Sequence, residues 1–127
     1  SIYEAAMAGN KYKLDNLVAM IDRNGLQISA STEDVMPIEP IRARWEAFGW
    51  DVHDIDGNSM EAIVKTLENI DYTNGKPHLV ILRTTKGFHV SLMENILKWH
   101  HGVPTAEEYE KAITEISNRI EELKKNC

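Results

Sequence analysis

The chain has 127 residues, of which 43% are hydrophobic and 27% are charged. This length and composition suit one globular domain over residues 1–127 and exclude a disordered chain. The net charge of −6 excludes the basic surface that a nucleic-acid-binding protein needs. The lone Cys127 excludes a disulfide framework, and no apolar run approaches the roughly 20 residues that span a bilayer, so we expect a cytoplasmic protein without a membrane partner.

The first part of the chain predicts a helix, a strand, a loop and a second helix. Ser1 and Glu4 fit a capping box at the start of the first helix. The apolar run that follows is too short for a helix and is bounded by turn residues, which predicts a strand buried on both faces. A proline pair opens the second helix and Gly49 ends it. The four segments are residues 1–9, 17–21, 27–38 and about 39–49.

The second part predicts two more strands and two more helices. A helix is capped by Asn58 or Ser59, and Thr105 with Glu108 forms a capping box for the last helix. The strands are expected at residues 50–55 and 78–85, with a long loop at 86–104. In the last helix, apolar residues recur at three-four spacing, which predicts packing on a core, with a partner-binding seam as the alternative. These residues are Tyr109, Ala112, Ile113, Ile116, Ile120 and Leu123.

This alternation of helices and strands predicts an α/β fold with a partial parallel sheet of about three strands flanked by helices. Right-handed crossovers place the carboxyl ends of parallel strands on one edge. Residues 22–28, 55–58 and 84–87 are therefore expected to share a rim. Ligands of open α/β sheets bind outside this edge.

The end of the first predicted strand carries oxygen-rich groups. Asp22 offers a carboxylate, Asn24 a carboxamide, and the backbone around Gly25 offers carbonyl groups. A hard cation such as Mg2+ prefers such oxygens. Because Asx-Gly pairs more often mark ordinary turns, the residues by themselves leave the plain turn as the alternative.

Seven stretches give the chain a family resemblance. They are residues 1–8, 12–19, 22–28, 45–50, 83–87, 90–94 and 99–105. On these stretches the chain resembles the thiamine-diphosphate-binding domain of transketolase, and most closely the N-terminal subunit of split bacterial and archaeal transketolases. The stretches follow the family's order over nearly the whole chain, which is far more specific than any one motif.

The resemblance implies thiamine diphosphate and Mg2+ as cofactors, with Ca2+ as the alternative ion. It implies that Asn24 gives Mg2+ a side-chain oxygen, that Leu26 gives its backbone carbonyl, and that Ile28 lies against the thiazolium ring. Asp22 is expected to orient the strand end or to contact the cofactor indirectly. His101 is expected to hydrogen-bond the ketol end of the substrate beside the cofactor diphosphate and to assist proton movement.

The chain also departs from the family pattern. The family's Gly-Asp-Gly, with its metal-binding aspartate, and its pyrimidine-binding domain, with a glutamate that activates the cofactor, are not among these residues. His89 stands where a second glycine is usual in the loop after Lys86-Gly87, and a positive φ would make histidine unfavourable there. We therefore expect the chain to be inactive without an upstream segment and a pyrimidine-domain partner.

Two functions follow from this sequence. The first is part of a transketolase that transfers a two-carbon ketol unit between sugar phosphates, with thiamine diphosphate carrying the carbanion chemistry. The second is a non-catalytic α/β module that acts in binding or assembly. The open edges of so small a sheet favour a partner chain or a homo-oligomer in both cases.

The remaining histidines carry weaker signals. His53 and His78 fall on predicted strands, where packed or exposed structural roles are commoner than ligand roles. His100 is adjacent to His101, and the sequence leaves open whether it supports His101 or is a plain surface residue.

Overall fold

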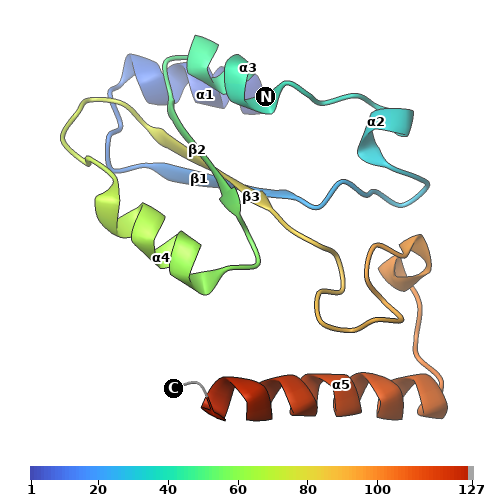
Figure 1. The fold of residues 1–127 in the computed structure, drawn as a ribbon. Coiled ribbons are helices and arrows are strands. Elements are labelled where there is room, and N and C mark those ends of the chain that lie inside the picture. The colour runs from blue at the N-terminus through green and yellow to red at the C-terminus, as the bar shows by residue number, and fades with distance from the viewer. Residues whose placement is uncertain (126–127) are drawn as a thin grey trace. The chain divides into compact units, whose positions relative to one another are not determined.

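The computed structural model describes residues 1–125, so Cys127 lies outside the described part (Figure 1). In this part no helix combines the length and the apolar character needed to cross a membrane. The elements are α1 (Ile2–Lys11), β1 (Val18–Arg23), α2 (Thr32–Val35), α3 (Ile41–Ala47), β2 (Asp51–Asp56), α4 (Met60–Asn69), β3 (His78–Arg83), the 3₁₀ helix η1 (Leu97–His100) and α5 (Ala106–Lys125).

These elements form two compact units. The first comprises Ser1–Asn24 and Met36–Thr84, and contains the whole sheet. The second comprises Gly25–Val35 and the described residues from Thr85 onward, including η1 and α5. One domain over residues 1–127 stays a prediction.

The sheet of the first unit has three parallel strands in the order β1-β3-β2. Arg83 at the end of β3 pairs with Arg23 at the end of β1 and with Asp56 at the end of β2. The three carboxyl ends are therefore level with one another. The predicted α/β fold, the parallel sheet and the shared rim within the first unit are confirmed.

Helices cover both faces of this sheet (Figure 1). On one face α1 and α3 contribute Ala6 and Trp45 to a core that includes Leu79 and Ile81 of β3, both fully buried. The indole Nε1 of Trp50 donates a 2.8 Å hydrogen bond to the carbonyl of Ala6, which fixes α1 to this core. Helix α4 lies on the opposite face.

Strand β1 differs from its prediction. It is an edge strand, and its Met20 side chain is 51% exposed, so burial on both faces is wrong for β1. Burial on both faces holds for the first four residues of β3, because β3 lies between the other two strands.

The two predicted capping boxes and the predicted loop at 27–38 can also be compared with the structure. Only half of the box at Ser1 forms: its side chain makes no capping bond, but Oε2 of Glu4 lies 2.8 Å from the Ser1 nitrogen. At α5 the box is confirmed, because the Thr105 amide donates to Glu108 at 2.8 Å and the Glu108 amide donates to the Thr105 hydroxyl at 3.2 Å. Helix α2 lies within the predicted loop, and at four residues it is too short to show periodicity.

The apolar stripe of α5 is largely uncovered. Ala112 is buried, but Ile113, Ile120 and Leu123 are 42%, 46% and 49% exposed. Within the second unit this stripe is therefore not buried, and both packing on a core and a partner-binding seam stay predictions.

Candidate functional site

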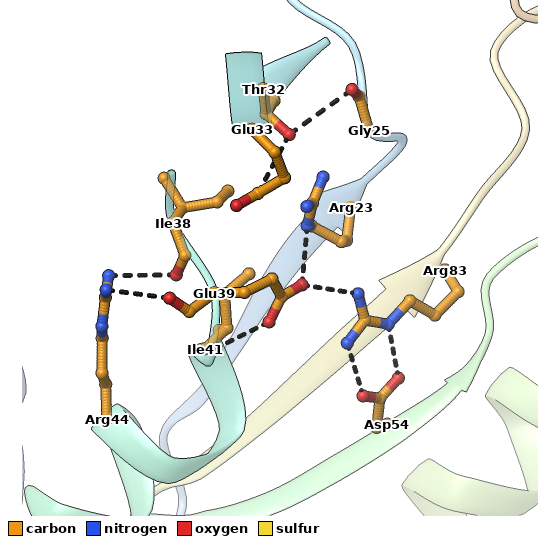
Figure 2. A network of polar contacts seen from close by, with 10 residues as sticks. All are labelled: Arg23, Gly25, Thr32, Glu33, Ile38, Glu39, Ile41, Arg44, Asp54 and Arg83. Carbon is orange, nitrogen blue, oxygen red and sulfur yellow. Dashed lines mark hydrogen bonds and ion pairs between the residues drawn. The ribbon is translucent and has the colours of Figure 1, made fainter. Parts of the chain in front are cut away.

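Glu39 connects two strand ends at the rim of the first unit (Figure 2). Its Oε1 accepts hydrogen bonds from Nε of Arg23 at 3.0 Å and from Nη1 of Arg83 at 2.8 Å. Its Oε2 accepts from the backbone amide of Ile41 at 2.9 Å, at the start of α3. One carboxylate thereby ties the ends of β1 and β3 to the helix that covers them.

Arg83 extends the network to β2. Its Nε and Nη2 donate to the two carboxylate oxygens of Asp54 at 2.9 and 2.8 Å, in the bidentate geometry that favours arginine over lysine (Figure 2). The Arg83 bonds, followed by the Ile41 amide, lower the pKa of Glu39 to about 2. Arg83 also lowers the pKa of Asp54, and the two carboxylates raise the pKa of Arg83. All three side chains are therefore charged at neutral pH.

Asp22 connects β1 and β3 on the same rim. Its Oδ1 accepts a hydrogen bond from the Thr84 hydroxyl, and its Oδ2 accepts one from Nδ2 of Asn24 at 3.2 Å. Both carboxylate oxygens thus have protein donors. The bond to Asn24 also defines the orientation of that amide, since its nitrogen faces Asp22 and its oxygen is at the opposite end. This geometry suits a positioning role for Asp22.

The chain makes a tight turn directly after Asn24. Gly25 has a φ of 76°, and its carbonyl accepts a 2.9 Å bond from the amide of Thr32. Leu26 pairs with Ser31 in an isolated antiparallel bridge. Ile28 is 62% exposed, and Nε2 of Gln27 is buried without a hydrogen-bond partner in the described part of the chain. The turn therefore places an apolar side chain at the surface and leaves an unused donor between Leu26 and Ile28.

His101 follows the 3₁₀ helix of the second unit. The side chain is exposed, and its backbone amide donates to the Lys98 carbonyl at 3.4 Å. The rings of His100 and His101 meet edge to face with centroids 4.4 Å apart, and His100 is also exposed. Of the predicted site residues, the structure brings Asp22 and Asn24 together in the first unit, while Leu26, Ile28 and His101 belong to the second.

In the loop after β3, His89 stands where a second glycine is usual in the family. Gly87 has a φ of +73°, and a Cβ there would lie 2.7 Å from the Met93 carbonyl oxygen, so only glycine fits. His89 has a φ of 69°, which is the conformation that a second glycine would adopt without strain. Its amide donates to Oε1 of Glu94 at 2.9 Å. The condition under which histidine is unfavourable at this position is therefore met.

Each predicted ligand, taken in its own unit, has donor chemistry that is compatible with Mg2+ or with a diphosphate. The Asn24 amide oxygen and the Leu26 carbonyl are neutral oxygen donors of the type that Mg2+ accepts. The buried Gln27 Nε2 is a donor suited to an anionic oxygen. Asp22, two residues before Asn24, is bonded to Thr84 and Asn24 through its two carboxylate oxygens, which suits a positioning role.

The sequence patterns missed the Glu39 network. Its members lie 16 and 44 residues apart in the chain, so no local motif joins them. Arg23 lies two residues after the first predicted strand, and Arg83 lies within the third. The parallel register makes the two arginines neighbours, and an acid between such like charges is stabilising.

The comparisons with known proteins agree with this fold. Residues 1–119 match the family described as transketolase, thiamine diphosphate binding domain. One subunit of the apulose-4-phosphate transketolase of Phocaeicola vulgatus is 67% identical over 125 residues, which cover 98% of this chain and 44% of that protein. The subunit of the same name from Actinobacillus succinogenes is 45% identical over 118 residues, with 93% and 42% covered.

A solved structure gives the same result. The transketolase of Campylobacter jejuni superposes with a TM-score of 0.76 at 33% identity, covering 87% of this chain and 17% of that one. The chain spans less than half the length of the two curated relatives. It belongs to the transketolase family and corresponds to part of the thiamine-diphosphate-binding domain.

Proposed function

We propose that the protein containing this chain is the cofactor-binding subunit of a two-subunit transketolase. The observation that carries the proposal is the 67% identity, over 98% of this chain, to a relative whose name makes it one subunit of a transketolase. The Asp22–Asn24 pair at the carboxyl rim supports it, because this edge is where α/β sheets bind ligands.

In this proposal Asn24 and Leu26 hold Mg2+ through a side-chain and a backbone oxygen, and Ile28 packs on the thiazolium ring. Asp22 keeps the Asn24 amide in its orientation through the 3.2 Å bond. Bound thiamine diphosphate supplies the electron sink for breaking and forming the carbon–carbon bond of the ketol unit. The Glu39 network keeps the strand ends rigid, which a preorganised site requires.

His101 binds the hydroxyl group at the ketol end of the substrate and transfers a proton there. Histidine suits this task because its protonation changes near neutral pH, and the exposed His101 side chain is accessible to a substrate. The edge-to-face contact with His100 restricts the His101 ring.

An apolar groove supports the need for further protein. It has a volume of about 390 Å³ and is lined by side chains of α1, β1 and α3, among them Tyr3, Met20 and Trp45. It lies beside an edge strand, and Tyr3 and Met20 are 46% and 51% exposed. We propose that a pyrimidine-domain partner and the remainder of the subunit complete the enzyme, as a homo-oligomer of such pairs.

The first sugar phosphate to test is apulose 4-phosphate. Two relatives, at 67% and 45% identity, carry this substrate in their names. Other ketose phosphates serve as comparison substrates in the same assay.

The test is a ketol-transfer assay with the complete subunit in the presence of its partner. Replacing His101 with Ala should slow the reaction by about 10²-fold, the usual scale of acid–base assistance. Asn118→Ala, at an exposed position of α5, is the control. His100→Ala resolves the role of that residue, because a supporting role predicts a smaller loss and a surface role predicts none.

An unchanged rate in His101→Ala would remove His101 from the mechanism. Absence of any transfer or cofactor binding by the wild-type complex would favour the non-catalytic module. The reading frame gives an independent check, since a transketolase of this kind requires an in-frame Gly-Asp-Gly before these residues.

A further inference from the structure

A cluster of metal-binding side chains lies at the amino ends of two strands, away from the rim described above. Asp51 is the first residue of β2 and His78 is the first residue of β3, and the two are direct partners in the parallel register. His53 follows Asp51 by two residues. Side chains alternate along a strand, so Asp51, His53 and His78 all project from the same face of the sheet.

The three side chains converge on one point. Oδ2 of Asp51 lies 3.6 Å from Nδ1 of His78 and 3.7 Å from Nε2 of His53. One ligand atom from each residue lies within 4.8 Å of the other two. In tetrahedral zinc sites, bonds of about 2.0–2.1 Å place neighbouring ligand atoms about 3.3 Å apart. Small side-chain rotations would bring this cluster to that spacing.

The histidine nitrogens lack hydrogen bonds. His78 is fully buried, and neither of its ring nitrogens has a hydrogen bond within residues 1–125. Nε2 of His53 is also buried without a hydrogen bond. Buried polar atoms are normally satisfied, so three such nitrogens in one cluster require an explanation. A bound cation provides one, because a neutral imidazole nitrogen is a good metal ligand.

The surroundings define one open side. The Asp51 side chain is 42% exposed and the His53 side chain is 27% exposed, so an ion can reach the cluster from solvent. Tyr72 packs edge-on against the His78 ring with centroids 5.7 Å apart. Oδ1 of Asp71 accepts hydrogen bonds from the hydroxyl of Thr73 at 2.6 Å and from its amide at 2.9 Å. The cluster of Asp51, His53 and His78 gives three protein ligands, which leaves the fourth position of a tetrahedral ion for water.

We propose that Asp51, His53 and His78 bind a divalent transition metal, Zn2+ in the first instance. Two imidazoles and one carboxylate form a donor set that suits Zn2+ and disfavours Mg2+. The ion would join the edge strand β2 to the central strand β3 at the end opposite the carboxyl rim. Its role is structural, and it is separate from the Asn24 site.

Calorimetry with ZnCl2 tests this on the complete protein carrying Cys127→Ser, which removes the thiol of this chain. We expect one Zn2+ per chain, with affinity at least about tenfold lower in both Asp51→Asn and His53→Gln. His100→Gln is the matched histidine control and should leave the affinity unchanged. The two tested positions are partly exposed, so these variants avoid the folding defect that a change at the fully buried His78 risks.

Thermal unfolding and Co2+ absorption provide further readouts. Zn2+ should raise the midpoint temperature of the wild type and not that of His53→Gln, and Mg2+ at the same concentration should do neither. Co2+ should give the absorption of a tetrahedral site in the wild type. Absence of Zn2+ binding by the wild type would overturn the proposal. Binding that persists in both Asp51→Asn and His53→Gln, or that is lost in His100→Gln, would also overturn it.

Discussion

The two ends of the sheet differ in how completely their polar side chains are hydrogen-bonded. At the carboxyl end, the carboxylates of Asp22, Glu39 and Asp54 accept two or more hydrogen bonds each from the protein itself. At the amino end, the ring nitrogens of His53 and His78 face a single carboxylate at distances beyond a hydrogen bond. The same three strands therefore carry one satisfied network and one unsatisfied cluster.

This difference distinguishes side chains that position their neighbours from side chains that can bind a ligand. A side chain whose polar atoms are all bonded within the protein is suited to hold its neighbours in place, as Asp22 does for Asn24. A buried nitrogen without a hydrogen bond is suited to bind something from outside. Charge alone favours Asp22 as a metal ligand at the carboxyl end, but its hydrogen bonds to Thr84 and Asn24 suit a positioning role.

The largest loss of stability is expected in the core beneath the central strand β3, which contributes residues to both ends of the sheet. Leu79 is fully buried at the centre of the sheet, so Leu79→Ala should destabilise the fold by about 2–5 kcal/mol through lost contacts and a cavity. Urea unfolding measures this, with the 46% exposed Val64 changed to Ala as the control. A loss below about 1 kcal/mol would show that the sheet is not the common support.

A smaller effect is expected at the carboxyl end alone. Glu39→Gln removes the negative charge that faces Arg23, whose side chain is only 8% exposed. Because Glu39 itself is partly screened by solvent, we expect a loss of about 1–2 kcal/mol at pH 7. The exposed Glu68→Gln on α4 is the matched control. An effect no larger than that of the control would contradict the role of the network.

The stability of the same variant should also depend on pH in a different way from that of the wild type. The pKa of Glu39 is lowered from 4.5 to about 2, so its contribution to stability is present above pH 4.5 and is lost as the pH falls toward 2. The stability difference between wild type and Glu39→Gln should therefore shrink over that interval. Unfolding curves at several acidic pH values measure it, and a constant difference would contradict the assigned pKa.

Local sequence patterns predicted the positions of the helices and strands well, but they predicted the burial of these elements poorly. The capping box at Thr105 and the cap at Ser59 were visible because each uses residues three apart. The burial of β1 was not visible, because an edge strand and a central strand share the same short apolar run. The exposure of Ile113 on α5 was likewise hidden, since periodicity marks an apolar face without showing what covers it.

The candidate sites were likewise predictable only where the residues are close in sequence or match a family motif. The family resemblance supplied roles for Asn24, Leu26 and His101, and the strand order confirmed the rim to which Asp22 and Asn24 belong. The amino-end cluster needed the register of β2 with β3, which pairs Asp51 with His78, far apart in the chain. Asp51 and His53, two residues apart on one strand, predict that two of the three side chains share a face, but they do not locate His78.

We propose above that Asn24 at the carboxyl end holds the metal of the cofactor. Calorimetry with thiamine diphosphate and Mg2+ on the complete subunit, in the presence of its partner, measures this. We predict saturable binding by the wild type, a loss of affinity of at least about tenfold in Asn24→Ala, and no change in His53→Gln at the other end of the sheet. Equal affinity in Asn24→Ala and the wild type would contradict the account.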